Sequence, residues 1–355
     1  MSRRAGGPET DRQAASAFAA QAPRGLVWVN DARPGICRER KGDGFVYRGV
    51  DGRRLRQAAE LKRIHSLAIP PAYEDVWICP RPNGHLQATG RDARGRKQYR
   101  YHPDWRVARD ADKFERMLEF GAALPRLRAR VKADLAAPLA ARPGRATVLA
   151  AIVHLLDTTH VRVGNKEYAR SNRSFGLTTL RSRHAAVEGS RLLLRFRGKS
   201  GKDHEVDLDD PRVARVVRRC QAMPGQELFQ YEDEAGALRV VDSNDVNDYI
   251  RAASGADFTA KDFRTWHGTV YALDLWAVQC AADAACRRTA NQLLADVAAR
   301  LGNTVAVCKK SYVHPRVLES LAAAADPEAL ARLSPTRRAG LTAAERRLLA
   351  FLKTP

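Results

Sequence analysis

A tyrosine hydroxyl stands among cations in the stretch CKKSYVHP, residues 308–315. Tyrosine can act as a nucleophile and form a covalent intermediate. At neutral pH its hydroxyl is almost wholly protonated, because the ordinary pKa is about 10, so attack needs assistance from neighbouring groups. Most tyrosines instead pack, with the ring in the core and the hydroxyl at its edge. Taken alone, these eight residues favour a packing role for Tyr312.

Three cations elsewhere in the chain could supply that assistance. They are Arg162 in HVRVGN, Lys199 in FRGKSGKDHEV and Arg264 in KDFRTWHGT. Cleaving a phosphodiester without a metal needs protein cations to offset the charge of the transition state, and a side-chain nucleophile. Each cation also has an ordinary structural interpretation: a helix-end cation, a turn lysine and an ion-pair partner of Asp262, respectively. Taken singly, each residue leaves both interpretations open.

The densest basic segment, RDARGRKQYRYHPDWR at 91–106, has six Arg and Lys residues with Tyr and Trp interleaved. Such cations bind phosphates, and aromatic rings pack against sugars or bases. Alternation along a strand would place Lys97, Tyr99 and Tyr101 on one face, with Gln98 and Arg100 on the other. A solvated basic hairpin is the alternative. The candidates for DNA contact are Arg91, Arg94, Arg96, Lys97, Gln98, Tyr99 and Tyr101.

The charge of the whole chain favours a polyanionic partner. Its 355 residues include 61 Lys and Arg against 40 Asp and Glu, a formal net charge of +21. This excess indicates nucleic acid, because each neutralised phosphate releases a counterion. The sequence has neither an apolar run of roughly 20 residues nor an apolar secretory signal. We therefore expect a cytoplasmic, nucleoid-associated protein.

Signatures of cofactor and metal chemistry are missing from the sequence. Gly198-Lys199-Ser200 is similar to the end of a phosphate-binding loop, but Leu193 stands where that motif requires glycine. The six cysteines form no CxxC pair, the nine histidines form no HExxH motif, and no carboxylates have two-metal spacing. We therefore expect neither ATP hydrolysis nor a cofactor nor a required metal.

The elements that must position these residues change in character along the chain. Short alternating runs at 26–105 (LVWVN, GFVYRG, DVWICP, HLQATG and KQYRYH) predict strands, with one helix near 55–64. Apolar residues at every third or fourth position predict helix from about 110. From 145 the chain is mostly helical, with helices at 146–160, 211–220, 244–253, 263–282 and 287–301 and a hairpin at 192–208. A Thr342-Ala-Ala-Glu345 capping box predicts a last helix.

These patterns indicate an α+β fold in four segments. They are a disordered basic tail (1–24), a small β-rich DNA-binding domain (25–107), a mostly helical catalytic domain carrying a small hairpin or sheet (108–320), and a helical tail (321–355).

The motifs together resemble those of type IB DNA topoisomerases. The residues Arg162-Val-Gly-Asn, Tyr168, Asn172 and Gly176-Leu-Thr-Thr-Leu are similar to the signature around that family's first catalytic arginine. FRGKSGKDHEV resembles its lysine hairpin, KDFRTWHGT its second-arginine motif, KKSYVHP its nucleophile motif, and ATGRDARGRKQYRYH its DNA-contacting strands. The resemblance covers about residues 25–320 in the family's motif order, and it is to the short bacterial or poxvirus-like form.

The resemblance implies ATP-independent relaxation of double-stranded DNA by a monomer shaped as a two-domain, C-shaped clamp. Tyr312 would attack the scissile phosphate, form a 3′-phosphotyrosyl bond and expel a 5′-hydroxyl, which reseals the strand after rotation. Arg162 and Arg264 would bind nonbridging oxygens. Lys199, which unlike arginine can lose its proton, would protonate the leaving oxygen. Tyr168 would contact a phosphate.

One position departs from the family pattern. Asn303 stands nine residues before Tyr312, where most relatives carry histidine. Its amide could donate a hydrogen bond to a nonbridging oxygen, or it could cap the helix expected at 304–310. His267 and His314 are expected to have no catalytic role.

Two other functions share some of these features. Tyrosine recombinases use the same residue types, but they usually carry His-x-x-Arg where this chain has Lys261-Asp-Phe-Arg264. A non-enzymatic, basic DNA-packaging protein would bind DNA and would not need Tyr312.

Overall fold

The computed structural model describes residues 22–354 apart from 43, 93, 94, 96, 139–141, 166–168, 170–172, 281–287, 323–332 and 334–336; for 107, 109–112, 200 and 280 it describes the backbone alone. The chain divides into two compact units, the first ending at Asp112 and the second beginning at Lys113. Most of the expected tail at 1–24 lies outside the described residues. So do four of the candidate residues named above: Arg94, Arg96, Tyr168 and Asn172.

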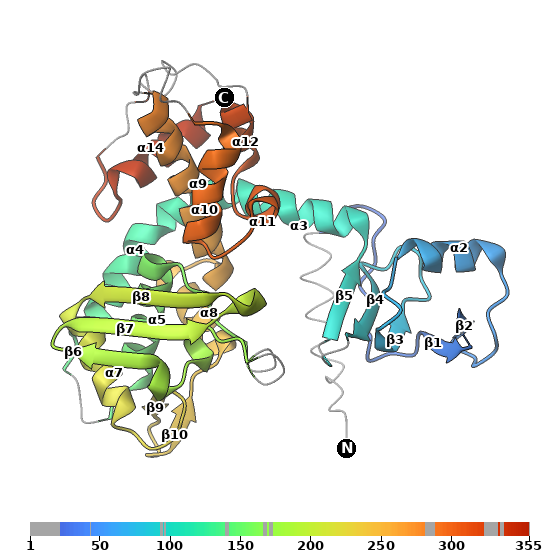
Figure 1. Cartoon of the computed structure of the whole chain (residues 1–355), viewed down its shortest axis with the longest axis horizontal. Helices are drawn as coiled ribbons and strands as arrows, with labels where there is room; N and C mark the ends of the chain where they lie inside the picture. Colours follow the sequence, from blue (N-terminus) through green and yellow to red (C-terminus); the bar gives the residue numbers. More distant parts are fainter. Residues whose placement is uncertain are drawn as a thin grey trace. The chain divides into compact units, whose positions relative to one another are not determined.

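The first unit is built on a five-stranded antiparallel sheet with the order β2-β1-β3-β4-β5 (Figure 1). Its strands are β1 (Ile36–Lys41), β2 (Gly44–Arg48), β3 (Glu74–Ile78), β4 (Leu86–Arg91) and β5 (Lys97–Tyr101). Helix α2 (Ala58–Ser66) covers one face, where Ile64 packs against apolar residues of four strands: Ile36, Tyr47, Val76, Ile78 and Ala88. The predicted β-rich character is thus confirmed.

The strands of this sheet differ from the prediction at two places. The prediction of a strand at 26–30 is wrong, because Val27 forms only an isolated bridge there. Strand β1, in contrast, was not predicted, since four of the six residues in ICRERK are charged. In the structure the Arg38 guanidinium donates hydrogen bonds to the carbonyls of Ile69 and Pro70, at 3.2 and 3.0 Å. These long-range contacts satisfy the charged group, and hydrophobic periodicity cannot reveal them.

Strand β5 alternates as its sequence predicts. Tyr99 pairs across the strands with Thr89, and Arg100 pairs with Ala88. Directly paired residues point to the same face, and Ala88 belongs to the core beneath α2. Tyr99 therefore lies on the opposite, open face, where it stacks on Tyr101 with ring centroids 6.1 Å apart. Both tyrosines are exposed.

The second unit is mostly helical and carries two small antiparallel sheets. One sheet has the order β6-β7-β8, and the other pairs β9 with β10. The strands are β6 (Ala185–Glu188), β7 (Arg191–Arg197), β8 (Asp203–Asp209), β9 (Gln230–Glu232) and β10 (Leu238–Val240). The helices are α4 (Met117–Ala136), α5 (Arg145–Thr159), α7 (Pro211–Gln221), α8 (Ser243–Ser254), α9 (Ala260–Cys280), α10 (Ala290–Arg300), α11 (Val305–Ser311), α12 (Pro315–Ala322) and α14 (Ala343–Lys353). Helix α3 (Pro103–Glu115) contains the boundary between the two units. The predicted α+β class and the hairpin are confirmed.

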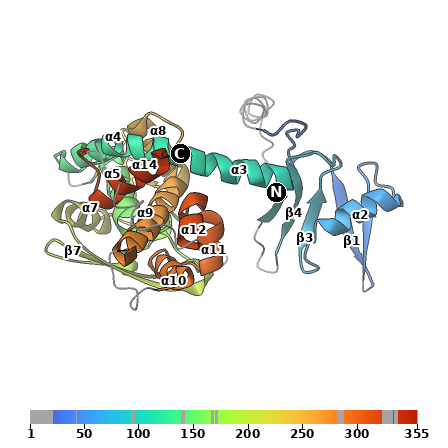
Figure 2. The ribbon, with the colours of Figure 1, turned by 90° about the horizontal axis from the view of Figure 1, so that it is seen from above.

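Helix α9 is the central element of this unit, in contact with α4, α5, α8, α10, α12 and α14. Figure 2 shows it between α5 and α12. Helix α14 begins at the predicted capping box, where the Thr342 hydroxyl accepts a hydrogen bond from the Glu345 N–H. Its residues Leu348 and Leu349 are buried in the same core. No helix in the described part of the chain is both long and apolar enough to cross a membrane.

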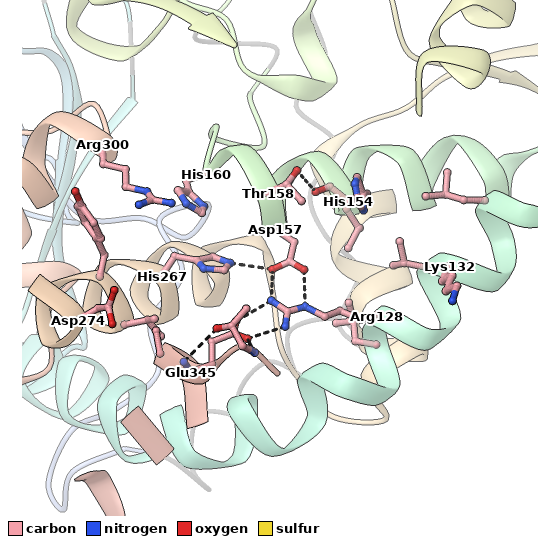
Figure 3. Close-up of a pocket in the computed structure, with 18 of the residues that line it drawn as sticks. Arg128, Lys132, His154, Asp157, Thr158, His160, His267, Asp274, Arg300 and Glu345 are labelled. Atoms are coloured by element: carbon pink, nitrogen blue, oxygen red, sulfur yellow. Dashed lines mark hydrogen bonds and ion pairs between the residues drawn. The ribbon is translucent and has the colours of Figure 1, made fainter. Parts of the chain in front are cut away.

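A buried ionic network joins α4, α5, α9 and α14 (Figure 3). Arg128 lies 2.7 Å from carboxylate oxygens of both Asp157 and Glu345. His267 Nε2 is 2.8 Å from Asp157, and Trp266 Nε1 donates to Glu345 at 3.1 Å. Four of these side chains line a cavity of about 560 Å³. We call these five residues the Arg128 network.

Both carboxylates of the network are ionised at neutral pH. Burial alone would raise the pKa of Asp157, but hydrogen bonds from His267 and Arg128 hold it well below its usual range. At Glu345, too, burial would raise the pKa, but the hydrogen bond from Arg128 lowers it, and the net shift is downward. The network therefore fixes charged groups that would be unfavourable in the core if any partner were removed.

We predict that Glu345→Ala lowers the free energy of unfolding by about 3–5 kcal/mol, the usual effect of breaking a buried ion pair. Urea unfolding at pH 7 measures it. The control is Asp207→Ala, which removes an exposed pair with Arg191 and should leave the midpoint nearly unchanged. A wild-type midpoint for Glu345→Ala would contradict the stabilising role of the network.

Candidate active site

Arg162 lies on an extended segment that is held by a close backbone approach. Helix α5 ends at Thr159, and His160 adopts a left-handed conformation, with φ 59°, that takes the chain out of the helix. The Arg162 carbonyl accepts a hydrogen bond from the Leu177 N–H at 2.9 Å. A Cβ on Gly176 would lie only 2.6 Å from that carbonyl oxygen. The glycine of the GLTTL motif is therefore required to position the Arg162 backbone.

Arg264 is buried near the start of α9, with 4% of its surface exposed. Its guanidinium donates hydrogen bonds to the carbonyls of His160, just after α5, and Leu301, just after α10. Carbonyls at helix ends lack partners within their own helix and accept such donors readily. The alternative prediction, that Arg264 forms an ion pair with Asp262, is wrong. The Asp262 carboxylate instead accepts hydrogen bonds from the N–H and the hydroxyl of Thr259, at 2.7 and 2.9 Å.

Tyr312 follows α11 directly and docks on α9. Its carbonyl oxygen is 3.1 Å from Thr269 Oγ1, and a Cβ on Gly268 would lie 2.7 Å from the same oxygen. The half-buried ring packs against the core, and the Arg264 guanidinium carbon lies 5.1 Å from the ring centroid. A packing role for the Tyr312 ring therefore does not exclude a role for the residue as a nucleophile, because the ring packs on the core and a guanidinium group lies over it.

Arg162 and Arg264 meet at Tyr312. Burial, and after it the charge of Arg264, lowers the pKa of Arg162, whereas the nearby Tyr312 opposes the shift. An arginine with a lowered pKa still carries its charge at neutral pH. Two guanidinium groups this close to one another can bind the oxygens of a phosphate.

Asn303 joins this group through Arg162. Its Oδ1 accepts a hydrogen bond from the Arg162 guanidinium, and its amide nitrogen is buried beside the Cys308 thiol. Thr304 caps α11, with its hydroxyl accepting from the Val307 N–H at 3.3 Å. The alternative that Asn303 serves as the helix cap is therefore wrong.

Lys199 lies exposed on the turn between β7 and β8, in the short 3-10 segment Lys199–Gly201. The hairpin contacts the site through a different residue, Lys202, whose Nζ donates to the Asn303 carbonyl at 2.8 Å. The structure thus brings Arg162, Arg264, Asn303 and Tyr312 into one cluster. It places Lys199 three residues from the contact that links the hairpin to that cluster.

Two residues of this hairpin, Lys202 and His204, were not among those predicted for the site. Burial lowers the pKa of His204, and the charges of Arg162, Arg264 and Lys202 lower it further. Because the charges of these three cations affect its pKa, the imidazole lies close to the cluster. Both residues belong to the FRGKSGKDHEV motif, so the motif contained the signal, but its residue types alone do not show which side chains turn inward.

The two histidines that were expected to have no catalytic role make structural contacts. His267 belongs to the Arg128 network. The His314 ring packs edge-on against Phe114, with centroids 5.3 Å apart, and burial lowers its pKa to about 4.

The comparisons with known proteins cover both units. A family model for the catalytic core of eukaryotic DNA topoisomerase I matches residues 102–330, a range that contains the whole cluster and Lys199. A model for the N-terminal domain of bacterial DNA topoisomerase IB matches residues 44–92. The DNA topoisomerase 1B of Acanthamoeba polyphaga mimivirus is 33% identical over 294 residues, which cover 80% of this chain and 87% of the viral protein.

These matches favour a topoisomerase over a recombinase or a non-enzymatic DNA-binding protein. They include the β-rich first unit as well as the catalytic core, and the match to the viral enzyme extends over most of both chains. The chain therefore belongs to the type IB DNA topoisomerase family and is a DNA topoisomerase.

Proposed function

We propose that this topoisomerase relaxes supercoiled duplex DNA by cutting one strand through transesterification at Tyr312. The observation that supports the proposal most is that the Arg162 and Arg264 guanidinium groups both lie close to Tyr312, with Arg264 5.1 Å from the centroid of its ring. Arginines so placed would bind the two nonbridging oxygens of the phosphate and offset the charge of the transition state.

In the cleavage step Tyr312 Oη forms a bond to phosphorus as the bond from phosphorus to the 5′ oxygen breaks. The phenol loses its proton to solvent water, and the leaving 5′ oxygen receives one from Lys199, acting as general acid. Arg162 and Arg264 bind the developing charge, and Asn303 contributes an uncharged amide donor. The product is a 3′-phosphotyrosyl bond with a free 5′-hydroxyl.

Resealing is the reverse of the same exchange. One phosphate ester replaces another in each direction, so the energy of the broken bond is kept in the phosphotyrosine. The free 5′ end can rotate about the intact strand and release supercoils before it attacks. No step in this scheme needs ATP, and one chain holds every group, so we propose that the enzyme acts as a monomer.

The first unit would hold the duplex through the open face of its sheet. Lys97 lies 5.4 Å from the centroid of the Tyr99 ring, and Tyr99 stacks on Tyr101 on the face opposite α2. This face, with Arg91 on the neighbouring strand, suits contacts to phosphates and sugars. Gln98 points to the other face, where its amide donates to Asp92 at 3.0 Å, so a role for Gln98 in base reading would require that bond to open.

We predict that Tyr312→Phe binds DNA normally and forms no covalent adduct, because the phenyl ring keeps the packing but lacks the attacking oxygen. Denaturing gels of a trapped reaction would detect the adduct, and a gel-shift titration would measure binding. An adduct formed by the Phe variant would contradict the role of Tyr312.

Arg162→Ala and Arg264→Ala should each slow single-turnover cleavage by about 10²–10³, the usual effect of removing a donor to a developing oxyanion. Arg191→Ala is a matched control, because its guanidinium bonds to Asp207 on the exposed sheet edge. Cleavage by either active-site variant at nearly the control's rate would refute the assignment.

Asn303→Ala should slow cleavage, because it removes both the proposed amide donor and the acceptor of the Arg162 guanidinium. Thr304→Ala should leave cleavage nearly unchanged and lower the thermal midpoint, since Thr304 caps α11 and loss of such a cap costs about 1 kcal/mol. Rapid-quench kinetics and thermal melts on both variants separate the two roles. Unchanged cleavage by Asn303→Ala would eliminate its proposed role.

A further inference from the structure

His204 lies in the middle of the hairpin that carries Lys199. It pairs across the strands with Phe196, and the two rings stack with centroids 5.2 Å apart and planes 8° from parallel. The imidazole is partly buried, although it lies on β8, beside an exposed turn. Its position is therefore fixed by packing on the Phe196 ring.

The other sides of the imidazole meet two glycines. A Cβ on Gly198 would lie 2.4 Å from His204 Cδ2, and a Cβ on Gly302 would lie 2.7 Å from His204 Cε1. Neither position can carry a side chain while the ring is there, and Gly302 also has a positive φ of 59°. Gly198 directly precedes Lys199, and Gly302 directly precedes Asn303. The His204 ring therefore fills the space between Gly198, which adjoins Lys199, and Gly302, which adjoins Asn303.

Hydrogen bonds tighten the same junction. The Gly198 N–H donates to the Lys202 carbonyl at 2.7 Å, and the Gly201 N–H donates to the Gly198 carbonyl at 3.1 Å, which closes the turn around Lys199. The Lys202 ammonium then donates to the Asn303 carbonyl. The turn is thus a closed loop that is joined to the Gly302–Asn303 segment by one ammonium group and one ring.

We propose that His204 is a positioning residue that docks the turn of the hairpin on the Gly302–Asn303 segment and so holds Lys199 at the leaving 5′ oxygen. The inference rests on the proposed role of Lys199 as general acid. It assigns to His204 a role that depends on the shape of the ring and needs no proton transfer by the imidazole.

The physical reason is the flexibility of lysine. A general acid must lie within hydrogen-bond reach of the atom that it protonates, and a lysine on an exposed turn has many rotamers and a mobile backbone. Docking the turn removes the backbone part of that freedom. A neutral ring suits the junction, because the nearby cations Arg162, Arg264 and Lys202 disfavour a charged one.

The nature of the leaving group distinguishes this role from a general structural one. In DNA with sulfur in place of the bridging 5′ oxygen, cleavage breaks a phosphorus–sulfur bond and releases a thiolate. A thiol has a pKa of about 8.5, so its anion leaves without being protonated first. Variants that only misplace the general acid should therefore cleave the sulfur substrate normally, whereas variants that disturb Tyr312 or the arginines should be slow on both substrates.

The experiment measures single-turnover cleavage of oxygen and sulfur duplexes at a site mapped with the wild-type enzyme. His204→Ala should slow the oxygen substrate by about 10² or more, the usual contribution of general acid catalysis, and should cleave the sulfur substrate within a few-fold of wild type. His204→Phe, which keeps a ring that can stack on Phe196, should recover most of the oxygen rate. Equal effects of His204→Ala on both substrates, or none on either, would overturn the inference.

Two further variants separate this inference from the function on which it rests. Lys199→Ala should itself be slow on oxygen and normal on sulfur; if sulfur does not rescue it, the general-acid role of Lys199 fails. If sulfur rescues Lys199→Ala but not His204→Ala, only the role of His204 fails. Should His204→Ala not fold, Lys202→Met, at an exposed position, tests the same docking, and a wild-type rate on oxygen would then count against it.

Discussion

The buried guanidinium of Arg264 is the interaction on which the site depends. By donating to the carbonyls of His160 and Leu301, it joins the end of α5 and the end of α10 to α9. Arg162 follows His160 by two residues, and Asn303 follows Leu301 by two. The same side chain lies over the Tyr312 ring. One arginine therefore sets the geometry of three chain segments that converge on the proposed phosphate site.

Helix α9 joins the site to the interior of the second unit. Helix α9 carries Arg264 and also Gly268 and Thr269, which hold the Tyr312 backbone. The next polar layer is the Arg128 network, which bonds His267 and Trp266 of α9 to α5, α4 and α14. Glu345 in α14 thus contacts the helix that carries Arg264, although it lies about 80 residues further along the chain. The hairpin is different, because it is attached through the His204 ring and the Lys202 ammonium group at its turn, which suits an element that would carry the proposed general acid.

Much of this could be predicted from sequence, and the failures have physical causes. Arg162, Arg264 and Tyr312, which the structure brings together, could be singled out because each lies in a local motif; the role of Lys199 stays a prediction. The glycine in the GLTTL motif is explained by its close approach to the Arg162 carbonyl. The contact of Asn303 with Arg162 could not be found, because a cap and a site residue look alike until the helix start is known to one residue. His204 was missed because its partners, Gly198 and Gly302, are about a hundred residues apart in sequence. Strand β1 was missed because its charged residues find carbonyl partners in another loop.

The central claim is that Tyr312 becomes attached to the 3′ end of a broken DNA strand. The most direct measurement is to trap the covalent complex of the wild-type enzyme, digest both components, and locate the nucleotide-bearing peptide by mass spectrometry. The account predicts a single modified residue, Tyr312, carrying the phosphate of a 3′ end. Attachment at another residue, or to a 5′ phosphate, would contradict it.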